Sequence, residues 1–159
     1  MKVLNIHQRQ IDQPKDRLLE LFSTLATKDD KVWPKEKWPR MKFENGLTTG
    51  AAGGHGPIRY TVLNNSNNGT IIFKFQSPPG FNGTHAFEIT ELNDNKTAIR
   101  HTIDMNTKTI ATLKWVFAIR WLHDALIEDA FDKVENYFTG KNKKTEWNIW
   151  VRFLRKILG

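Results

Sequence analysis

Residues 113–138, LKWVFAIRWLHDALIEDAFDKVENYF, decide the fold. This stretch contains neither glycine nor proline, and apolar residues recur along it at helical spacing. They are Trp115, Val116, Ile119, Leu122, Leu126, Ala130 and Val134. A rise of 1.5 Å per residue predicts a helix of about seven turns and roughly 39 Å. Gly140 follows at the position where helices commonly end. A helix this long with one apolar stripe needs another layer against which to bury it.

Turn-forming residues divide residues 41–105 into short segments, which is typical of an antiparallel meander. The predicted turns are the glycine-rich Gly50–Gly56, Asn67–Gly69, Pro78–Gly80 with Asn82 and Gly83, and Asn93–Asn95. Between the turns, apolar and polar residues alternate, so the sheet should have one buried and one wet face. The buried face would carry Ile58, Tyr60 and Val62; Ile71, Phe73 and Phe75; His85, Phe87 and Ile89; and Ile99, His101, Ile103 and Met105. Arg59 and Arg100 have the opposite parity and should point outward.

The N-terminal third supplies a strand, a short helix and a loop. Residues 3–11 alternate, with Leu4, Ile6, Gln8 and Gln10 on one face and Val3, Asn5, His7, Arg9 and Ile11 on the other. Residues 12–14 provide a cap and an early proline, and Leu18, Leu19, Phe22 and Leu25 follow at helical spacing. The prolines of residues 32–39 exclude helix interior and central strand, which leaves an ordered loop anchored by tryptophans. The prediction is an α+β domain in which a curved antiparallel sheet wraps the long C-terminal helix around an apolar cavity.

The net charge of +7 is concentrated at the C-terminus. Residues 141–159 carry six lysines and arginines and one acidic residue, Glu146, so they hold +5 and leave +2 for residues 1–140. We therefore expect a ligand-binding domain at 1–140 and a basic amphipathic helix at 141–159. A nucleic-acid-binding domain would carry its basic face on the folded domain itself, so no nucleic acid is expected as a partner.

Other compositional features exclude several classes of protein and site. The chain has no cysteine, which excludes disulfides, thiolate zinc sites and cysteine nucleophiles. It starts without a signal-peptide core and has no apolar run of about 18 residues, so we expect a cytoplasmic protein, with peripheral membrane association as the alternative. The glycosylation sequons at Asn64, Asn68, Asn82 and Asn95 are then chance products of an asparagine-rich chain.

The C-terminal segment combines an apolar stripe with cations. Trp147, Trp150, Val151, Leu154, Ile157 and Leu158 share one helix face, and Arg152, Arg155 and Lys156 lie elsewhere on the helix. Such helices bind anionic membranes, with tryptophan at the interface. The alternative is that the stripe packs on its own domain or on a dimer mate, because an exposed stripe of this size favours aggregation.

Four motifs carry a resemblance to a known superfamily. They are Gly53–Tyr60 (GGHGPIRY), Pro78–His85 (PPGFNGTH), Leu122–Asp129 (LHDALIED) and the tail pattern Trp147-x-x-Trp150-Val151-Arg152. With the order of elements, they resemble an uncharacterised bacterial subgroup of the SRPBCC, or helix-grip, superfamily of START domains, birch-pollen-type allergens and polyketide cyclases. The resemblance spans nearly the whole chain and implies the helix-grip fold. It does not specify the chemistry, because the superfamily includes lipid carriers, hormone binders, cyclases and oxygenase domains. The five histidines lack the local ligand spacing of the oxygenases, so neither a metal nor a cofactor is expected.

Two histidines are the main candidate polar groups. If the last hairpin turns at 93–95, Phe87 lies opposite His101 and His85 opposite Ile103, so both imidazoles point into the apolar interior. They could hydrogen-bond a ligand carbonyl or move a proton, or they could merely satisfy a backbone group or a buried carboxylate. The candidate ligand contacts are Trp33, Trp38, Phe43, His55, Tyr60, Phe73, Phe75, His85, Phe87, His101, Ile103, Met105, Trp115, Ile119 and Leu122.

Two further groups remain open to more than one interpretation. His55 lies among glycines, in a loop that could approach an oxyanion or could simply turn. His123, Asp124, Glu128 and Asp129 could supply acid–base chemistry, or they could form a solvated helix face with an Arg120–Asp124 pair.

The sequence thus favours a noncatalytic binder or carrier of a small hydrophobic or amphipathic ligand, lipid-like or polyketide-like, oriented by His85 and His101. One alternative is a cyclase or dehydratase that uses the same histidines as acid and base. Another is a membrane-associated adaptor that acts through the C-terminal helix.

Overall fold

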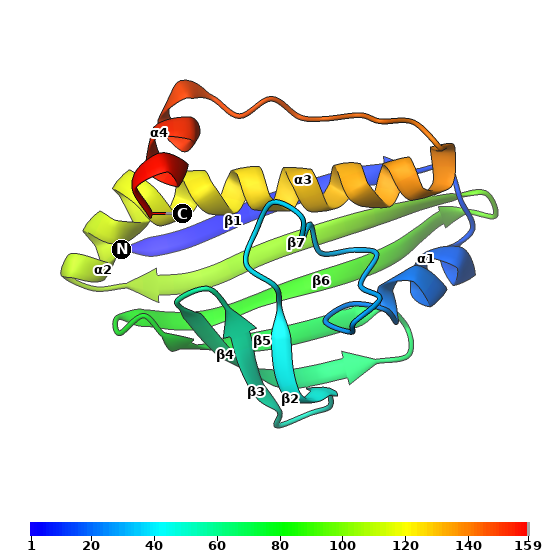
Figure 1. The fold of residues 1–159 in the computed structure, drawn as a ribbon. Helices are drawn as coiled ribbons and strands as arrows, with labels where there is room; N and C mark the ends of the chain where they lie inside the picture. Colours follow the sequence, from blue (N-terminus) through cyan, green and yellow to red (C-terminus); the bar gives the residue numbers. More distant parts are fainter. Residues whose placement is uncertain (159) are drawn as a thin grey trace.

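A computed structural model describes residues 1–158 as one antiparallel sheet with a long helix lying along it (Figure 1). The elements in chain order are β1 (Lys2–Ile11), α1 (Lys15–Phe22), β2 (Lys42–Leu47), β3 (Ala52–His55), β4 (Ile58–Ser66), β5 (Thr70–Ser77), β6 (Phe81–Asn93), β7 (Lys96–Thr107), α2 (Ile110–Lys114), the π-helical turn η1 (Trp115–Ile119), α3 (Arg120–Thr139) and α4 (Ile149–Leu158). Residue 159, the last of the predicted tail segment, lies outside the described residues.

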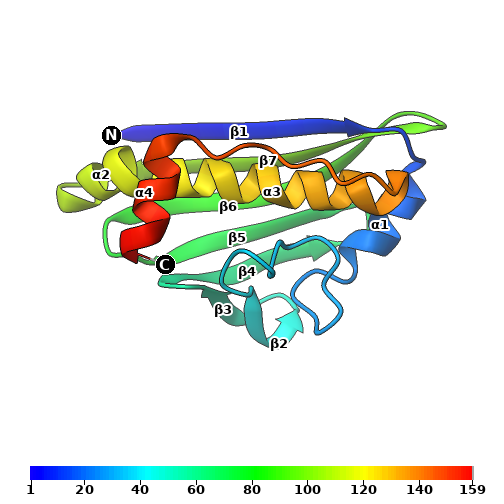
Figure 2. The ribbon, with the colours of Figure 1, turned by 45° about the horizontal axis from the view of Figure 1, so that its top comes forward.

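The sheet has seven strands in the order β1-β7-β6-β5-β4-β3-β2, all antiparallel to their neighbours. It curves around α3, which lies across its concave face (Figure 2). The register predicted for the last hairpin is confirmed, because Phe87 pairs with His101 and His85 with Ile103. The predicted helix-grip architecture, including a C-terminal helix after the long one, is therefore the observed fold.

The long helix begins earlier and is less regular than its sequence pattern predicts. It runs from Ile110 to Thr139 through the π-helical turn, and Gly140 ends it in the left-handed conformation, at φ 66°. The wider turn changes the angular spacing of the side chains within it, Val116 included. Val116 is consequently 39% exposed, so its predicted place in the buried stripe is wrong, whereas Trp115 is buried.

The glycine-rich segment is more extended than predicted. We predicted a turn over Gly50–Gly56, but Ala52–His55 form strand β3. A side chain at Gly53 would collide with the Lys42 carbonyl and the Phe43 ring. Glycine is needed there because β2 lies directly against it, and not because the chain turns.

The first strand presents its polar face to the helix. His7 and Arg9 point toward α3, whereas Leu4 and Ile6 are 62% and 50% exposed on the outside. The main core lies at the other end of the sheet, between α1, the tryptophan-bearing loop before β2, and the C-terminal half of α3. A smaller core cluster around Phe81, Ile103 and Trp115 lies at the end near α2.

The C-terminal segment crosses back over the long helix. Residues 140–148 run along α3 without regular structure, and α4 then lies beside the start of the long helix (Figures 1 and 2). Val151 and Leu154 of α4 are buried against the rest of the chain. This part of the apolar stripe therefore packs on its own domain. No helix formed within residues 1–158 is both long and apolar enough to span a bilayer.

Candidate functional site

A mostly apolar cavity of about 370 Å³ lies between the sheet and the long helix. Most of the predicted ligand contacts line it: Trp33, Trp38, His55, Tyr60, Phe75, His85, His101, Ile103, Trp115, Ile119 and Leu122. Four do not. Phe73, Phe87 and Met105 are buried in the packed core, and Phe43 lines a separate open groove outside β2 and β3. Strand parity placed Phe73, Phe87 and Met105 on the inner face, but packing against neighbouring side chains covers them.

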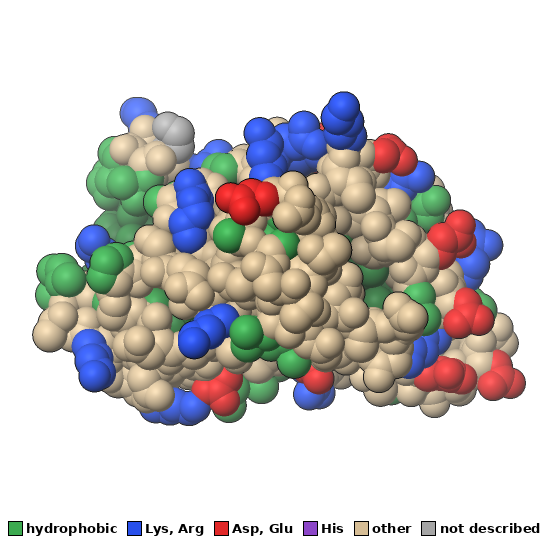
Figure 3. Space-filling model, turned by 90° about the horizontal axis from the view of Figure 1, so that it is seen from below, with side chains coloured by type: hydrophobic (Ala, Val, Ile, Leu, Met, Phe, Trp, Pro, Cys, Tyr) green, Lys and Arg blue, Asp and Glu red, His purple; other side chains and the backbone are tan. Residues whose placement is uncertain are grey.

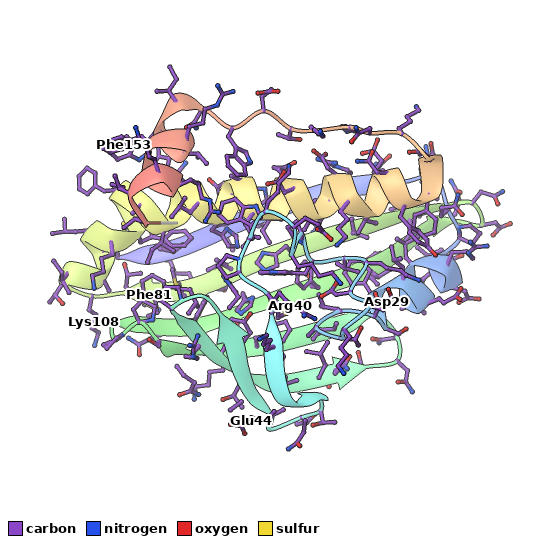
Figure 4. The ribbon with its side chains drawn as sticks, in the orientation of Figure 1. Asp29, Arg40, Glu44, Phe81, Lys108 and Phe153 are labelled. Carbon is purple, nitrogen blue, oxygen red and sulfur yellow. The ribbon has the colours of Figure 1, made fainter. Side chains whose placement is uncertain are left out.

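Several cavity residues were missed by the sequence analysis. Phe81, labelled in Figure 4, comes from the turn we predicted around Pro78–Gly83. Arg155 and Leu158 reach the cavity from α4, which no local pattern indicates. His123 had a usable signal, since it lies four residues after Ile119 and four before Ile127 on the cavity side of the helix.

The five histidines form a row through the interior, together with Tyr60. The ring of His55 lies 5.9 Å from that of Tyr60, which lies 4.6 Å from that of His85. Nδ1 of His85 and Nε2 of His101 are 3.3 Å apart and share a hydrogen bond. The row continues from His101 to the His123 ring at 5.0 Å, and from His123 to the His7 ring at 5.9 Å. These residues come from strands β1, β3, β4, β6 and β7 and from α3, so only the tertiary fold brings them together.

Several polar atoms on this wall lack a partner. Within residues 1–158, no hydrogen bond is made by the Tyr60 hydroxyl, Nε2 of His85, Nδ1 of His101 or Nε2 of His123, and Nδ1 of His123 has only the Asp124 carboxylate nearby, at 3.6 Å. All four residues line the cavity. Leaving a buried polar group without a hydrogen bond costs roughly 1–3 kcal/mol of stability. A polar group of a ligand that enters the cavity could form these hydrogen bonds and remove that cost.

Burial keeps this wall uncharged at neutral pH. It lowers the pKa of His55 to about 3 and those of His85 and His101 well below their ordinary value, and nearby histidines lower them further. The pKa of His123 is lowered mainly by burial, and that of the Tyr60 hydroxyl is raised well above its usual range by the same cause. Neutral imidazoles can both donate and accept hydrogen bonds, and so they can act as acid or base.

His7, at the far end of the row, behaves in the opposite way. Its burial alone would lower its pKa, but hydrogen bonds to Asp124 and Glu128 outweigh that effect and raise the pKa to about 9. The ring nitrogens lie 3.0 Å from the Asp124 carboxylate and 2.8 Å from that of Glu128. Glu128 also accepts a hydrogen bond from Arg9 at 2.6 Å. His7 is therefore an imidazolium ion held between two carboxylates.

The acidic residues of α3 do not form the solvated face that was one of the two interpretations of their sequence pattern. The Arg120–Asp124 pair is present, at 3.7 Å, but Asp124 and Glu128 turn toward β1. Asp129 is 3% exposed and lies on the other side of the helix. The interpretation failed because the cations that neutralise these carboxylates come from β1, far away in the sequence.

Asp129 joins three separate segments of the chain. Its carboxylate accepts hydrogen bonds from the Trp38 indole at 2.8 Å and the Trp147 indole at 3.0 Å, and it also pairs with Lys37. The Trp38 and Trp147 rings lie 5.3 Å apart. The guanidinium of Arg155 lies 4.6 Å above the Trp38 ring and donates a hydrogen bond to the Lys37 carbonyl. These contacts hold the tryptophan-bearing loop and the tail over the cavity.

The predicted tail contacts divide into two groups. Trp147, Val151, Leu154 and Arg155 pack on the domain, whereas Trp150, Arg152, Lys156, Ile157 and Leu158 remain exposed. Only part of the apolar stripe is thus buried against its own chain.

One group of potential metal ligands occurs within the described chain. Donor atoms of His7, His123 and Asp124 lie within 4.8 Å of one another. Both ring nitrogens of His7 are already hydrogen-bonded to carboxylates, so this cluster balances its charges without a cation.

The sequence matches no family model and no curated protein. Solved structures are similar in fold. Norcoclaurine synthase from Thalictrum flavum, solved in complex with dopamine and hydroxybenzaldehyde, has 11% identity and a TM-score of 0.66 over 90% of each chain. CalU16 from Micromonospora echinospora has 12% identity and a TM-score of 0.59, and the match covers 99% of this chain and 91% of that one. A START superfamily protein from Mycobacterium smegmatis has 12% identity and a TM-score of 0.53, with 84% and 95% covered. With its curved seven-stranded sheet and long C-terminal helix, this chain has the helix-grip fold of these START-like proteins.

Proposed function

We propose that this protein is a noncatalytic binder or carrier of a small hydrophobic or amphipathic molecule, held in the cavity with its polar end against His85 and His101. The observation that carries the proposal is the combination of an apolar space of about 370 Å³ with unpartnered polar atoms on one wall. Apolar walls with a few polar groups are characteristic of small-molecule sites, and the volume is in their range.

The charge state of the cavity wall limits which chemical groups can form the polar end of the ligand. The imidazoles of His85 and His101 are neutral, and the Tyr60 hydroxyl remains protonated. Hydroxyl, carbonyl and amide groups suit such a wall, because they exchange hydrogen bonds without a buried charge. Norcoclaurine synthase, whose fold this chain shares, was solved in complex with dopamine and hydroxybenzaldehyde, which supports small-molecule binding by a protein of this fold.

Filling the cavity should remove the ligand. Ala118 lines the cavity, and Ala118→Trp would place an indole in the space the ligand needs. We expect native mass spectrometry of protein purified from its own host to show a bound small molecule in the wild type and at least about tenfold less in this variant, since tenfold corresponds to about 1.4 kcal/mol.

Ala52→Trp is the matched control, because Ala52 is exposed on β3 and does not line the cavity. The control should retain the ligand. The binding proposal is wrong if wild-type protein repeatedly carries no small molecule, or if both variants retain it equally.

The second candidate function is a cyclase or dehydratase in which His85 and His101 act as acid and base. The 3.3 Å contact between their ring nitrogens favours it, since a proton can pass directly from one imidazole to the other. Incubation of the wild type with its co-purified ligand, followed by mass spectrometry, separates the two functions. A carrier should return the ligand unchanged, and His101→Ala should only weaken retention. A product lacking one water, formed by the wild type and absent with His101→Ala, would establish the enzyme instead.

The exposed part of the tail favours an additional role at a membrane surface, which needs no ligand. Ile149, Phe153 and Ile157 are 85%, 48% and 57% exposed on α4, beside Arg152 and Lys156. Amphipathic helices of this composition bind anionic membranes.

A further inference from the structure

Exposed apolar side chains gather at one end of the molecule, where the start of the long helix and α4 lie side by side. The patch consists of Ile110, Leu113, Val116, Phe117, Trp150, Phe153, Ile157 and Leu158, which we call the mouth patch. The Trp150 indole donates a hydrogen bond to the Phe117 carbonyl at 2.9 Å, which joins the two helices. Figure 3 shows hydrophobic side chains collected at this end, with lysine and arginine side chains around them.

The mouth patch includes part of the cavity rim. Leu158 lines the cavity and is 63% exposed, so it lies at the rim. Lys114, at the end of α2, is also exposed and lines the cavity. Ala118 of η1 and Arg155 of α4 also line the cavity. A surface bound to the mouth patch would therefore face the cavity opening.

The charges around the mouth patch select its partner. Residues 105–123 and 147–158 contain six lysines and arginines and no acidic residue. Arg120 and Arg152 have carboxylate neighbours in Asp124 and Glu146. Lys108 (labelled with Phe153 in Figure 4), Lys114 and Lys156 are exposed, and no side-chain carboxylate of residues 1–158 lies within 4.0 Å of their ammonium groups. A second copy docked on the same patch would bring like charges together, whereas an anionic surface would neutralise them.

We propose that the mouth patch docks on an anionic lipid bilayer and holds the cavity opening against it. Phe117, Phe153 and Ile157 enter the interface, and Lys114 and Lys156 reach the lipid phosphates. The part of this inference that concerns entry of a ligand into the cavity rests on the proposed binding function. An apolar molecule then passes between bilayer and cavity without crossing water.

Vesicle binding tests the docking. The full chain should sediment with vesicles of phosphatidylcholine and phosphatidylglycerol, and much less with phosphatidylcholine alone. Lys114→Gln with Lys156→Gln should weaken binding to anionic vesicles about thirtyfold, as expected for two lost cations near an anionic surface. Phe117→Ser with Phe153→Ser should weaken it at least about tenfold, because these rings are exposed in solution and buried in the interface.

Leu63→Ser with Leu92→Ser is the matched control. These leucines are 45% and 46% exposed on β4 and β6, outside the mouth patch, and their replacement should leave vesicle binding unchanged. Circular dichroism should show the same folded spectrum for all three double variants, since every substituted side chain is exposed.

Three results would overturn the docking. The first is no binding of the wild type to anionic vesicles, and the second is equal loss in the control and patch variants. The third is a dimer in analytical ultracentrifugation that Phe117→Ser with Phe153→Ser abolishes while no vesicle binds. Native mass spectrometry measures retention of the cavity ligand separately, which keeps the two proposals distinct. If the wild type retains its ligand but does not bind anionic vesicles, only the docking is rejected. If it binds the vesicles but carries no ligand, only the binding function is rejected.

Discussion

Replacing Asp129 with alanine is expected to lower the free energy of unfolding by about 3–5 kcal/mol, the usual cost of breaking a buried charged pair. The substitution leaves the indole groups of Trp38 and Trp147 and the ammonium group of Lys37 without their shared acceptor. Urea denaturation monitored by tryptophan fluorescence would measure the loss. Because these contacts fix the tail, the lysines at 141, 143 and 144 should also become more sensitive to trypsin than in the wild type.

Asp94→Ala is the matched control, because Asp94 is an exposed residue in the turn between β6 and β7. Its substitution should change the free energy of unfolding by no more than about 0.5 kcal/mol. A loss of less than about 1 kcal/mol in Asp129→Ala, comparable to one ordinary hydrogen bond, would show that the carboxylate does not hold these segments together.

Acidification from pH 7 to pH 5.5 is expected to destabilise the protein by about 2 kcal/mol through its buried histidines. His85 and His101 have folded-state pKa values well below their ordinary value because they are buried. In the unfolded chain they take up protons near pH 6.5, so their contribution to stability is present above that pH and is lost as the pH falls below it. Each accounts for about 1 kcal/mol over this interval, and His55, whose ring is partly exposed, adds a smaller share.

The contribution of His7 to stability depends on pH in the opposite direction. Its folded-state pKa is raised to about 9, so its stabilising effect is complete below the unfolded value of 6.5 and is lost as the pH rises through 9. This effect offsets part of the acid loss and adds a second decline in alkali. Stability should therefore be greatest near neutral pH.

Urea denaturation at pH 5.5, 7 and 9 would measure both declines. His101→Gln should remove about half of the acid loss. His7→Gln should remove the alkaline decline and enlarge the acid loss, because the offset from His7 is then absent. Equal stability of the wild type at pH 5.5 and 7, or an undiminished acid loss in His101→Gln, would contradict the neutral state assigned to the cavity wall.

The architecture was predictable because its signals are local. The helical period of residues 113–138 and the alternation between short turns each depend on neighbours in the sequence. The turn predicted at Asn93–Asn95 correctly gave the register of β6 and β7 at His85 and His101, although the observed strands reach that register through an irregularity between Glu91 and Asn93. Local period could not reveal the π-helical turn, so Val116 was assigned to the wrong side of the helix.

The cavity wall and the tail were decided by tertiary structure. The sequence determined an α+β chain with inward-facing histidines on two strands and a basic amphipathic end. It could not show that all five histidines form one row, that His7 lies between carboxylates 117 and 121 residues away, or that Asp129 joins Trp38 to Trp147. Propensity and period act over a few residues, whereas the charge state of a buried group and the partner of an apolar face depend on segments that meet only when the sheet closes around the helix.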